Sequence, residues 1–338
     1  MREKNLLAAN GKDMTEVKYR LGVVIPAYKV SRFILPLIER IGSNVERIFV
    51  VDDCCPEGSG RIVADKYPDS TKVRVLFHDE NQGVGAALVT GYQEALRSGL
   101  TVIVKLDGDG QMDPDFIPSL VRPILAGRAD YTKGNRFFRL ESLKGMPPAR
   151  VFGNAILSFV SKITNGYWNV MDPTNGFTAI HSSVLSLLPL DKLEKRYFFE
   201  NDMLFRLSTV RAVVQDVPMD SVYGDEISNL KIGSVLREFP PKFLSRFLKR
   251  IFYNYFLRDF NLCSVELIFG YILLLLGVLF GLSQWFQSGL SGTPASAGTV
   301  MLAALPIVIG LNLLIAAISY DISNTPKDPM HLVLIKAD

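Results

Sequence analysis

The sequence lacks the features that would place it among secreted or disulfide-stabilised proteins. Its first twenty residues carry basic side chains such as Arg2 and Lys18 but no apolar core, so we expect no secretory signal peptide. Only 3 cysteines occur in 338 residues, without paired or metal-binding spacing, which predicts reduced thiols. Cys54 and Cys55 are adjacent, and a disulfide between neighbours would close a strained ring. Two small turn residues are therefore the simpler interpretation of that pair.

Two glycine motifs that bind nucleotides in other folds are also absent. The first predicted strand is followed by IPAYKV instead of GxGxxG, which disfavours a nicotinamide or flavin enzyme. No GxxxxGK[ST] loop is present, which disfavours an ATPase or GTPase of the P-loop type. The formal net charge of +3 is too small to indicate a nucleic-acid partner.

In the first part of the chain, near-continuous apolar runs alternate with segments of helical periodicity. The runs predict strands at residues 21–25, 47–51, 73–77 and 101–106. The segments between them predict helices at residues 31–41, 59–67 and 83–96. Together they predict an open, mostly parallel α/β sheet with helices on both faces. In such a sheet the ligand lies beyond the carboxyl ends of the strands.

The segment VIVKLDGDGQMDPDF ends one of these strands with four carboxylates. Asp107 and Asp109 share a face if the segment is extended, and there they can bind one hard cation. Mg²⁺ or Mn²⁺ takes its other ligands from water and substrate phosphates, so this open pair predicts a metal–diphosphate site. Asp113 and Asp115 instead fit the start of the next helix. A calcium-binding EF-hand loop is excluded because the required Gly and Glu positions hold other residues.

The last third of the chain is strongly apolar and begins with an amphipathic pattern. In residues 238–260 one helical stripe is apolar, with Phe243, Phe247, Ile251 and Tyr255. The basic residues of this segment lie largely elsewhere, and they are Lys242, Arg246, Lys249 and Arg250. This pattern predicts a basic amphipathic helix on an anionic membrane surface. A helix that docks on the preceding domain is the alternative interpretation.

Two uncharged apolar runs follow, at residues 267–282 and 300–318. With their neutral flanks, each approaches the roughly 20 residues that cross a bilayer. Basic residues precede the first run and follow the second, so the positive-inside rule predicts that both ends and the preceding domain are cytoplasmic. Pro306 and Asn312 inside the second run favour packing against a neighbouring helix, and a homo-oligomer is one option. A buried helical hairpin is the alternative.

Seven motifs in order carry a resemblance to a known family. They are VVIPAY, VVDD, NQGVGAALVTGYQEA, KLDGDGQMDPD, KGNRF, DPTNGFTAI and FFENDMLFRL. Over roughly residues 20–235 the chain resembles inverting family 2 glycosyltransferases of GT-A fold, and among them the polyprenyl-phosphate glycosyltransferases. The resulting division of the chain is a polar N-terminal segment, a GT-A catalytic domain, a membrane-surface helix, a two-span hairpin and a cytoplasmic tail, at residues 1–18, 19–235, 236–260, 261–320 and 321–338.

The resemblance implies a nucleotide-sugar site and a metal site. The first strand end and the VDD turn would bind the base and ribose, through Pro26, Tyr28, Asp52 and Asp53. Asp107 and Asp109, with Gln111 nearby, would hold Mg²⁺ or Mn²⁺ on the diphosphate. The metal would offset negative charge on the departing nucleoside diphosphate.

The resemblance also implies an acceptor site. Arg136 and Arg150 would grip the acceptor phosphate, for which a planar guanidinium is suited. Asn154 stands where the family has a serine, and Lys231 matches a late basic residue that closes over phosphates. Asp172 would lie close to the sugar or the acceptor phosphate, although its DPTNG motif is also a good turn. Glu200 and Asp202 occupy the positions of the catalytic base in other members, or else orient a substrate.

The implied function is transfer of a hexose, with inversion, from a nucleotide sugar to undecaprenyl or dolichyl phosphate, with UDP-glucose favoured and GDP-mannose next. We expect the enzyme to be integral to the bacterial inner membrane. Because a polyprenyl phosphate is already anionic, we expect catalysis to rest mainly on positioning and charge neutralisation. Three alternatives are a family 2 enzyme with a saccharide hydroxyl acceptor, a non-catalytic nucleotide-sugar-binding protein and a lipid-carrier translocase. Two spans are few for a channel or a translocase, and the acidic pair disfavours a protein without turnover.

Overall fold

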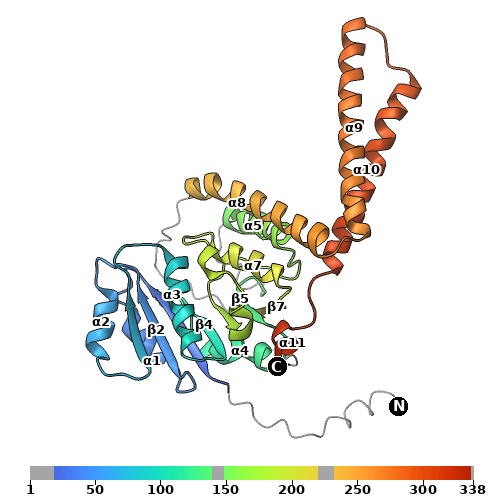
Figure 1. Cartoon of the computed structure of the whole chain (residues 1–338). Coiled ribbons are helices and arrows are strands. Elements are labelled where there is room, and N and C mark those ends of the chain that lie inside the picture. The colour runs from blue at the N-terminus through green and yellow to red at the C-terminus, as the bar shows by residue number, and fades with distance from the viewer. Residues whose placement is uncertain (1–18, 139–147, 220–231, 336–338) are drawn as a thin grey trace, which may run out of the picture.

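The structure is a computed structural model that describes residues 19–138, 148–219 and 232–335. An α/β body is followed by a long helix and a helical hairpin that projects from the body (Figure 1). The chain then returns to the body, where its last helix lies. All 3 cysteines are free, as their spacing predicted.

A seven-stranded sheet forms the centre of the body, with strand order β3-β2-β1-β4-β6-β5-β7. The strands are β1 Leu21–Ala27, β2 Arg47–Asp52, β3 Val73–Phe77, β4 Val102–Lys105, β5 Tyr131–Asn135, β6 Thr178–His181 and β7 Val214–Pro218. All pairs are parallel except those of β6, which runs antiparallel to both β4 and β5. The four predicted strands and the mostly parallel sheet are confirmed.

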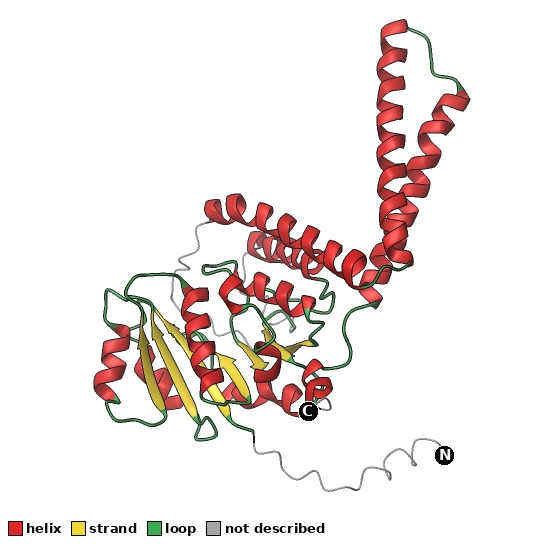
Figure 2. Cartoon of the chain, viewed as in Figure 1, coloured by secondary structure: helices red, strands yellow, loops and turns green. Residues whose placement is uncertain are grey.

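Helices cover both faces of the sheet (Figure 2). They are α1 Ile34–Arg40, α2 Ser59–Lys66, α3 Val84–Arg97, α4 Ile117–Leu125, α5 Pro148–Asn165, α6 Ser182–Leu185 and α7 Phe199–Thr209. Alternate residues of β1 enter two different cores because a strand points successive side chains to opposite faces. Val23 and Ile25 join the core under α1 and α4, whereas Val24 joins the core under α3 and α7.

The second pair of carboxylates in the acidic motif starts a helix, as predicted. Asp113 caps the short 3₁₀ helix Pro114–Phe116, and its carboxylate accepts from the N–H of Asp115 at 3.0 Å. Arg40 Nη2 lies 2.5 Å from Asp113 Oδ1 and 3.4 Å from Asp115 Oδ2. Asp113 and Asp115 therefore have their own counter-ion and take no part in the site that follows β4.

The helix α8, Ile232–Phe252, packs along α5 and α7 and ends in a π-helical turn, Tyr253–Arg258. Three of its basic residues face the body: Lys242 and Arg246 pair with Glu194, and Arg250 pairs with Asp321. Lys249, the fourth basic residue predicted for the membrane surface, is exposed. The expectation that these three cations lie on an anionic membrane is wrong, because buried or half-buried carboxylates of the same chain neutralise them. The exposed residues of α8 include Leu244 and Leu248, each more than half exposed, as well as the charged Lys249.

Two long apolar helices form the hairpin, α9 Leu262–Ser291 and α10 Ala297–Ser323. Both are long and apolar enough to cross a membrane. They pack closely where small residues meet, since a Cβ on Gly310 would lie 2.8 Å from the carbonyl oxygen of Gly270. Asn312 is exposed on the outside of this pair. The predicted packing of this residue against a further helix therefore stays a prediction.

A buried ion pair joins the hairpin to the body. Arg250 Nη1 of α8 lies 2.6 Å from Asp321 Oδ1 at the end of α10, and Arg250 Nε donates to the carbonyl of Thr164 at 2.9 Å. Trp168 Nε1 donates to the other oxygen of Asp321 at 2.9 Å. Beyond α10, the helix α11 (Met330–Ile335) docks on the body, where Asp130 accepts from the backbone N–H groups of Met330 and His331, each at 2.8 Å. The segment that follows the hairpin is thus attached to the body.

We expect Asp321→Ala to lower the free energy of unfolding by roughly 3–5 kcal/mol, because it leaves the buried Arg250 guanidinium without its counter-ion. Chemical denaturation in detergent, followed by intrinsic fluorescence, measures the change. Asp328→Ala is the matched control, since Asp328 is exposed and lies in the same part of the chain. Equal stability of the two variants would show that the Arg250–Asp321 pair does not hold the hairpin to the body.

Candidate active site

A cleft of about 750 Å³ lies beyond the carboxyl ends of β1, β2 and β4. Five residues predicted for the nucleotide-sugar and metal sites line it, and they are Pro26, Tyr28, Asp53, Asp107 and Asp109. The cleft also contains residues that the sequence analysis did not select, among them Asn81, Arg196 and Tyr197. Its position agrees with the rule that ligands of open α/β sheets bind at strand ends.

Asp107 receives a buried counter-ion from its own strand. The side chain of Lys105, at the end of β4, is 1% exposed, and its Nζ lies 2.7 Å from Asp107 Oδ1 and 3.7 Å from Glu200 Oε1. Burial opposes the charge of Lys105, but the carboxylates of Asp107 and Glu200 outweigh it and raise the Lys105 pKa above its ordinary value. Burial raises the pKa of Glu200 to about 7, although Lys105 acts in the opposite direction.

The DPTNG loop closes against this group. A Cβ on Gly176 would overlap Lys105 Nζ and Asp107 Oδ2, so a larger residue at this position would displace both side chains. Asp109 accepts from the N–H of Gln111 at 3.0 Å, so the backbone of Gln111 orients this carboxylate. Hard oxygen donors on the wall of an open cleft suit Mg²⁺ or Mn²⁺ whose remaining ligands come from phosphates and water. No cluster of three or more His, Cys, Asp or Glu residues that could hold a metal ion occurs within the described residues.

The two aspartates of the VDD turn have different surroundings. Asp53 lines the cleft, and its carboxylate accepts from the N–H groups of Gln82 and Gly83 at 2.9 and 2.7 Å. Asp52 does not line the cleft: its oxygens accept from the N–H groups of Cys55 and Gly60, both at 2.6 Å. The structure therefore gives Asp52 a structural role in the turn and brings only Asp53 to the predicted nucleotide site.

The predicted acceptor residues are partly brought together. Arg136 makes a bidentate pair with the buried Asp172, with Nε to Oδ2 at 2.8 Å and Nη2 to Oδ1 at 3.1 Å. Asn154 lines a mostly apolar groove of about 290 Å³ with Phe137 and Phe159. Arg150 lies in α5, but its side chain is outside the described residues, as is the whole of Lys231.

Glu200 and Asp202 both lie on α7 but pair with different side chains. Glu200 faces Lys105, as described above. Asp202 is fully buried, where Oδ2 lies 2.9 Å from Arg206 Nε and Oδ1 lies 2.6 Å from Arg246 Nε. Asp202 also accepts from the N–H of Glu194 at 3.0 Å. Two arginines and a backbone N–H occupy this carboxylate, so Asp202 anchors α8 to α7 and does not enter the cleft.

Two buried lysines were missed by the sequence analysis. Lys105 and Lys133 stand in register with the same residue of β6, so they lie in one row across the sheet. Lys133 donates to the carbonyl of Asn175, and burial lowers its pKa to about 8. The sequence does carry a signal for them: a lysine inside an otherwise apolar strand indicates a buried ammonium, and a buried ammonium requires a partner.

Comparison with known proteins finds a family match and several relatives. Residues 22–188 match the family described as "Glycosyl transferase family 2". The chain is 28% identical over 216 residues to the UDP-N-acetylglucosamine–dolichyl-phosphate N-acetylglucosaminyltransferase of Methanococcus voltae, covering 60% of this chain and 86% of that protein. It is 28% identical over 222 residues to the undecaprenyl-phosphate mannosyltransferase of Micrococcus luteus, covering 65% and 90%.

The fold also matches a solved structure. Glucosyl-3-phosphoglycerate synthase from Mycobacterium tuberculosis, in complex with Mn²⁺, UDP and glucosyl-3-phosphoglycerate, superposes with a TM-score of 0.53 at 20% identity. The match covers 68% of this chain and 80% of that one. At this identity the likeness shows a shared fold.

We expect Lys105→Met to lower the free energy of unfolding by about 3 kcal/mol, because it removes the cation between two carboxylates in a buried position. Adding Glu200→Gln should recover part of the loss, since it removes one of the two charges left without a partner. Denaturant titration in detergent measures both variants, with the exposed Lys66→Met as control. Strictly additive effects of the two substitutions would contradict the coupling of Lys105 with Glu200.

Proposed function

We propose that this chain, a family 2 glycosyltransferase by its domain at residues 22–188, transfers a hexose from a nucleotide sugar to a polyprenyl phosphate with inversion. The names of the relatives from M. voltae and M. luteus support a polyprenyl-phosphate acceptor. UDP-glucose is the first donor to test and GDP-mannose the next, and the M. voltae relative adds UDP-N-acetylglucosamine. The observation that carries the proposal is one loop, 172–176, in which Gly176 lies against Asp107 of the acidic pair and Asp172 pairs with Arg136.

That loop brings the donor and acceptor sites within reach of each other. At one end, Gly176 packs against Lys105 and Asp107 of the acidic site. At the other end, Asp172 holds the guanidinium of Arg136 in a fixed plane. A nucleotide sugar in the cleft would therefore present its anomeric carbon toward a phosphate bound near Arg136. Fixed orientation of the two reactants is itself a large part of catalysis in such a transfer.

The remaining residues of the two sites act through their charges. A divalent cation held by Asp107 and Asp109 supplies, when bound, positive charge against the departing nucleoside diphosphate. The ammonium of Lys105, 2.7 Å from Asp107 Oδ1, orients that carboxylate. Arg136 offsets the charge of the acceptor phosphate, which attacks as an anion and leaves no proton to remove. A saccharide hydroxyl acceptor would need a base, and Glu200, with a pKa of about 7, is the carboxyl suited to that alternative.

The membrane-facing features support a lipid acceptor. The groove beside Asn154 is mostly apolar and lies along α5, which packs against α8 at the base of the hairpin (Figure 1). Phe152 and Phe159 of α5 are more than half exposed, as are Leu244 and Leu248 of α8. Such an apolar surface suits the bilayer interface. We place the catalytic body on the cytoplasmic side, at the bacterial inner membrane, because basic residues flank the hairpin on the side of the body.

Incubation of the full chain with a labelled nucleotide sugar and undecaprenyl phosphate should yield a chloroform-extractable labelled lipid. Asp107→Asn and Asp109→Asn should each lower the rate by roughly 100-fold or more, since charge stabilisation of this kind is worth about that much. Chelation with EDTA should have the same effect and added Mn²⁺ or Mg²⁺ should reverse it. If no common donor labels a lipid, or only a saccharide hydroxyl is labelled, the proposed acceptor is wrong.

Arg136→Gln should raise the KM for undecaprenyl phosphate by about 10-fold or more, because a charge-assisted hydrogen-bond pair is worth roughly 1.5–3 kcal/mol. The KM for the nucleotide sugar should change little. Initial rates at varied acceptor concentration measure the difference, with the exposed Arg61→Gln as a control for loss of one positive charge. If only the KM for the nucleotide sugar rose, Arg136 would belong to the donor site and its assignment to the acceptor site would be wrong.

A further inference from the structure

Residues 190–197 form a strap that crosses from the edge of the body to the cleft. The strap begins with the 3₁₀ helix Leu190–Lys192 and ends just before α7. Its backbone docks on the start of α3, where the carbonyl of Lys195 accepts from the N–H groups of Gly85 and Ala86 at 2.8 and 3.2 Å. Because these donors belong to the first turn of α3, the strap supplies the cap that the helix start otherwise lacks.

The glycines of the NQGVG motif allow this close approach. A Cβ on Gly85 would lie 2.1 Å from the carbonyl oxygen of Glu194, and a Cβ on Gly83 would lie 2.5 Å from that of Lys195. Gly83 also has a φ of +100°, a conformation that other residues rarely adopt. In this chain the motif therefore makes room for a second segment of protein at the rim of the cleft.

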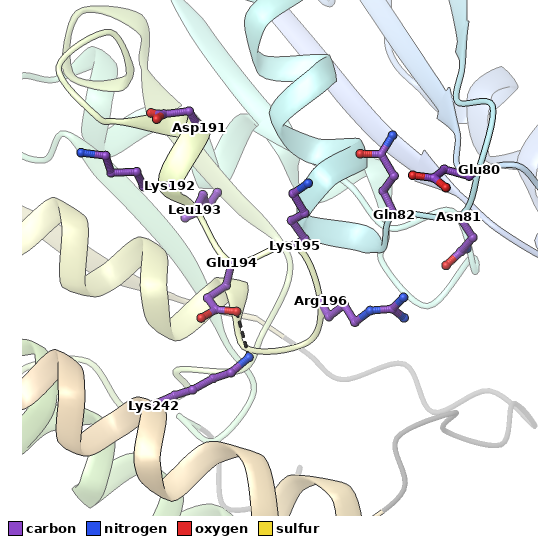
Figure 3. A pocket seen from close by; sticks show the side chains of 10 residues that line it. All are labelled: Glu80, Asn81, Gln82, Asp191, Lys192, Leu193, Glu194, Lys195, Arg196 and Lys242. Carbon is purple, nitrogen blue, oxygen red and sulfur yellow. Dashed lines mark hydrogen bonds and ion pairs between the residues drawn. The ribbon is translucent and has the colours of Figure 1, made fainter.

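The opposite side of the strap is held by α8. The Glu194 carboxylate lies 2.8 Å from Lys242 Nζ and 2.9 Å from Arg246 Nη2 (Figure 3 shows the first pair). With α3 on one side and α8 on the other, the backbone of the strap has a fixed position. The fixed backbone therefore also fixes the direction in which each side chain leaves the strap.

Arg196 is the cation that the strap delivers to the cleft. Its side chain extends toward Asn81 (Figure 3) and lines both the cleft and a neighbouring cavity of about 500 Å³. Across the described residues, the guanidinium of Arg196 has no ion pair or hydrogen bond. The three carboxylates that line the cleft already have partners of their own. Asp107 pairs with Lys105, and Asp53 and Asp109 accept from backbone N–H groups. The positive charge of Arg196 is thus left for a ligand.

We propose that Arg196 is a further binding residue, which grips the diphosphate of the nucleotide sugar. The inference rests on the proposed function, because that function supplies a diphosphate to the cleft. A planar guanidinium can bind two phosphate oxygens at once and keeps its charge at any physiological pH. Arg196 would hold the diphosphate from the strap side, while Asp107 and Asp109 lie on the β4 side of the same cleft.

The test is binding of UDP, GDP and the corresponding nucleosides to the full chain in detergent, by calorimetry with Mg²⁺ present. Arg196→Gln should weaken binding of the nucleoside diphosphate by about 10- to 100-fold, the range for hydrogen bonds to charged groups. Binding of the phosphate-free nucleoside should stay within about 2-fold. Arg196→Lys should give an intermediate loss, because it keeps the charge and removes the planar fork.

Lys192→Gln is the matched control. Lys192 is an exposed cation on the same strap, and it lines the neighbouring cavity but not the cleft. Its substitution should leave diphosphate binding within about 2-fold of the unchanged chain. Arg196→Gln exposes no apolar surface, and an unchanged unfolding midpoint would confirm that the variant is folded.

Three outcomes would overturn the assignment. If the unchanged chain binds UDP or GDP and Arg196→Gln binds it equally well, the role of Arg196 is wrong and the proposed function stands. If nucleoside binding falls as much as diphosphate binding, or if the acceptor KM rises instead, Arg196 does not grip the donor diphosphate. If the unchanged chain binds neither nucleoside diphosphate and labels no lipid, the proposed function fails together with this inference.

Discussion

The structure depends above all on two lysine side chains buried at the carboxyl end of the sheet. Lys105 and Lys133 are both within 1% of full burial, and an ammonium in such a position is tolerated only with compensating partners. Lys105 draws in Asp107 and Glu200, and Lys133 takes the carbonyl of Asn175. The loop after β4, the DPTNG loop and the first turn of α7 must therefore converge at this row. The cleft, the acidic pair and the Arg136–Asp172 pair all take their positions from that convergence.

The sheet and the hairpin could be predicted because their signals are local. Continuous apolar runs identify strands β1 to β4, and two uncharged stretches identify α9 and α10, since burial on both faces or in lipid leaves no room for polar side chains. The acidic pair was predictable for the same reason: it ends a buried strand. The order of the remaining strands was not, because β6 enters between β4 and β5 and its pairing is set by contacts far along the chain.

The roles of individual charges were harder to predict, and α8 shows why. Periodicity identifies which residues of a helix share a face, but not which carboxylates that face will meet. Arg246 meets Asp202 and Arg250 meets Asp321, and both partners are more than 40 residues away in the sequence. The same reason explains Asp52, whose oxygens accept from N–H groups of its own turn, and Asp202, which the family resemblance placed with Glu200 at the catalytic-base position. With Arg246 and Arg250 turned inward, the exposed side of α8 carries Leu244 and Leu248 beside Lys249, a combination that suits the interface of a bilayer.

The central claim is that a diphosphate-bound metal ion lies on Asp107 and Asp109, above the buried Lys105. Anomalous diffraction from crystals of the full chain grown with UDP and Mn²⁺ tests it directly. The account predicts one strong manganese peak in contact with both carboxylates and the diphosphate, with Lys105 still paired to Asp107. A peak elsewhere in the cleft, or UDP bound with no metal at these carboxylates, would contradict it.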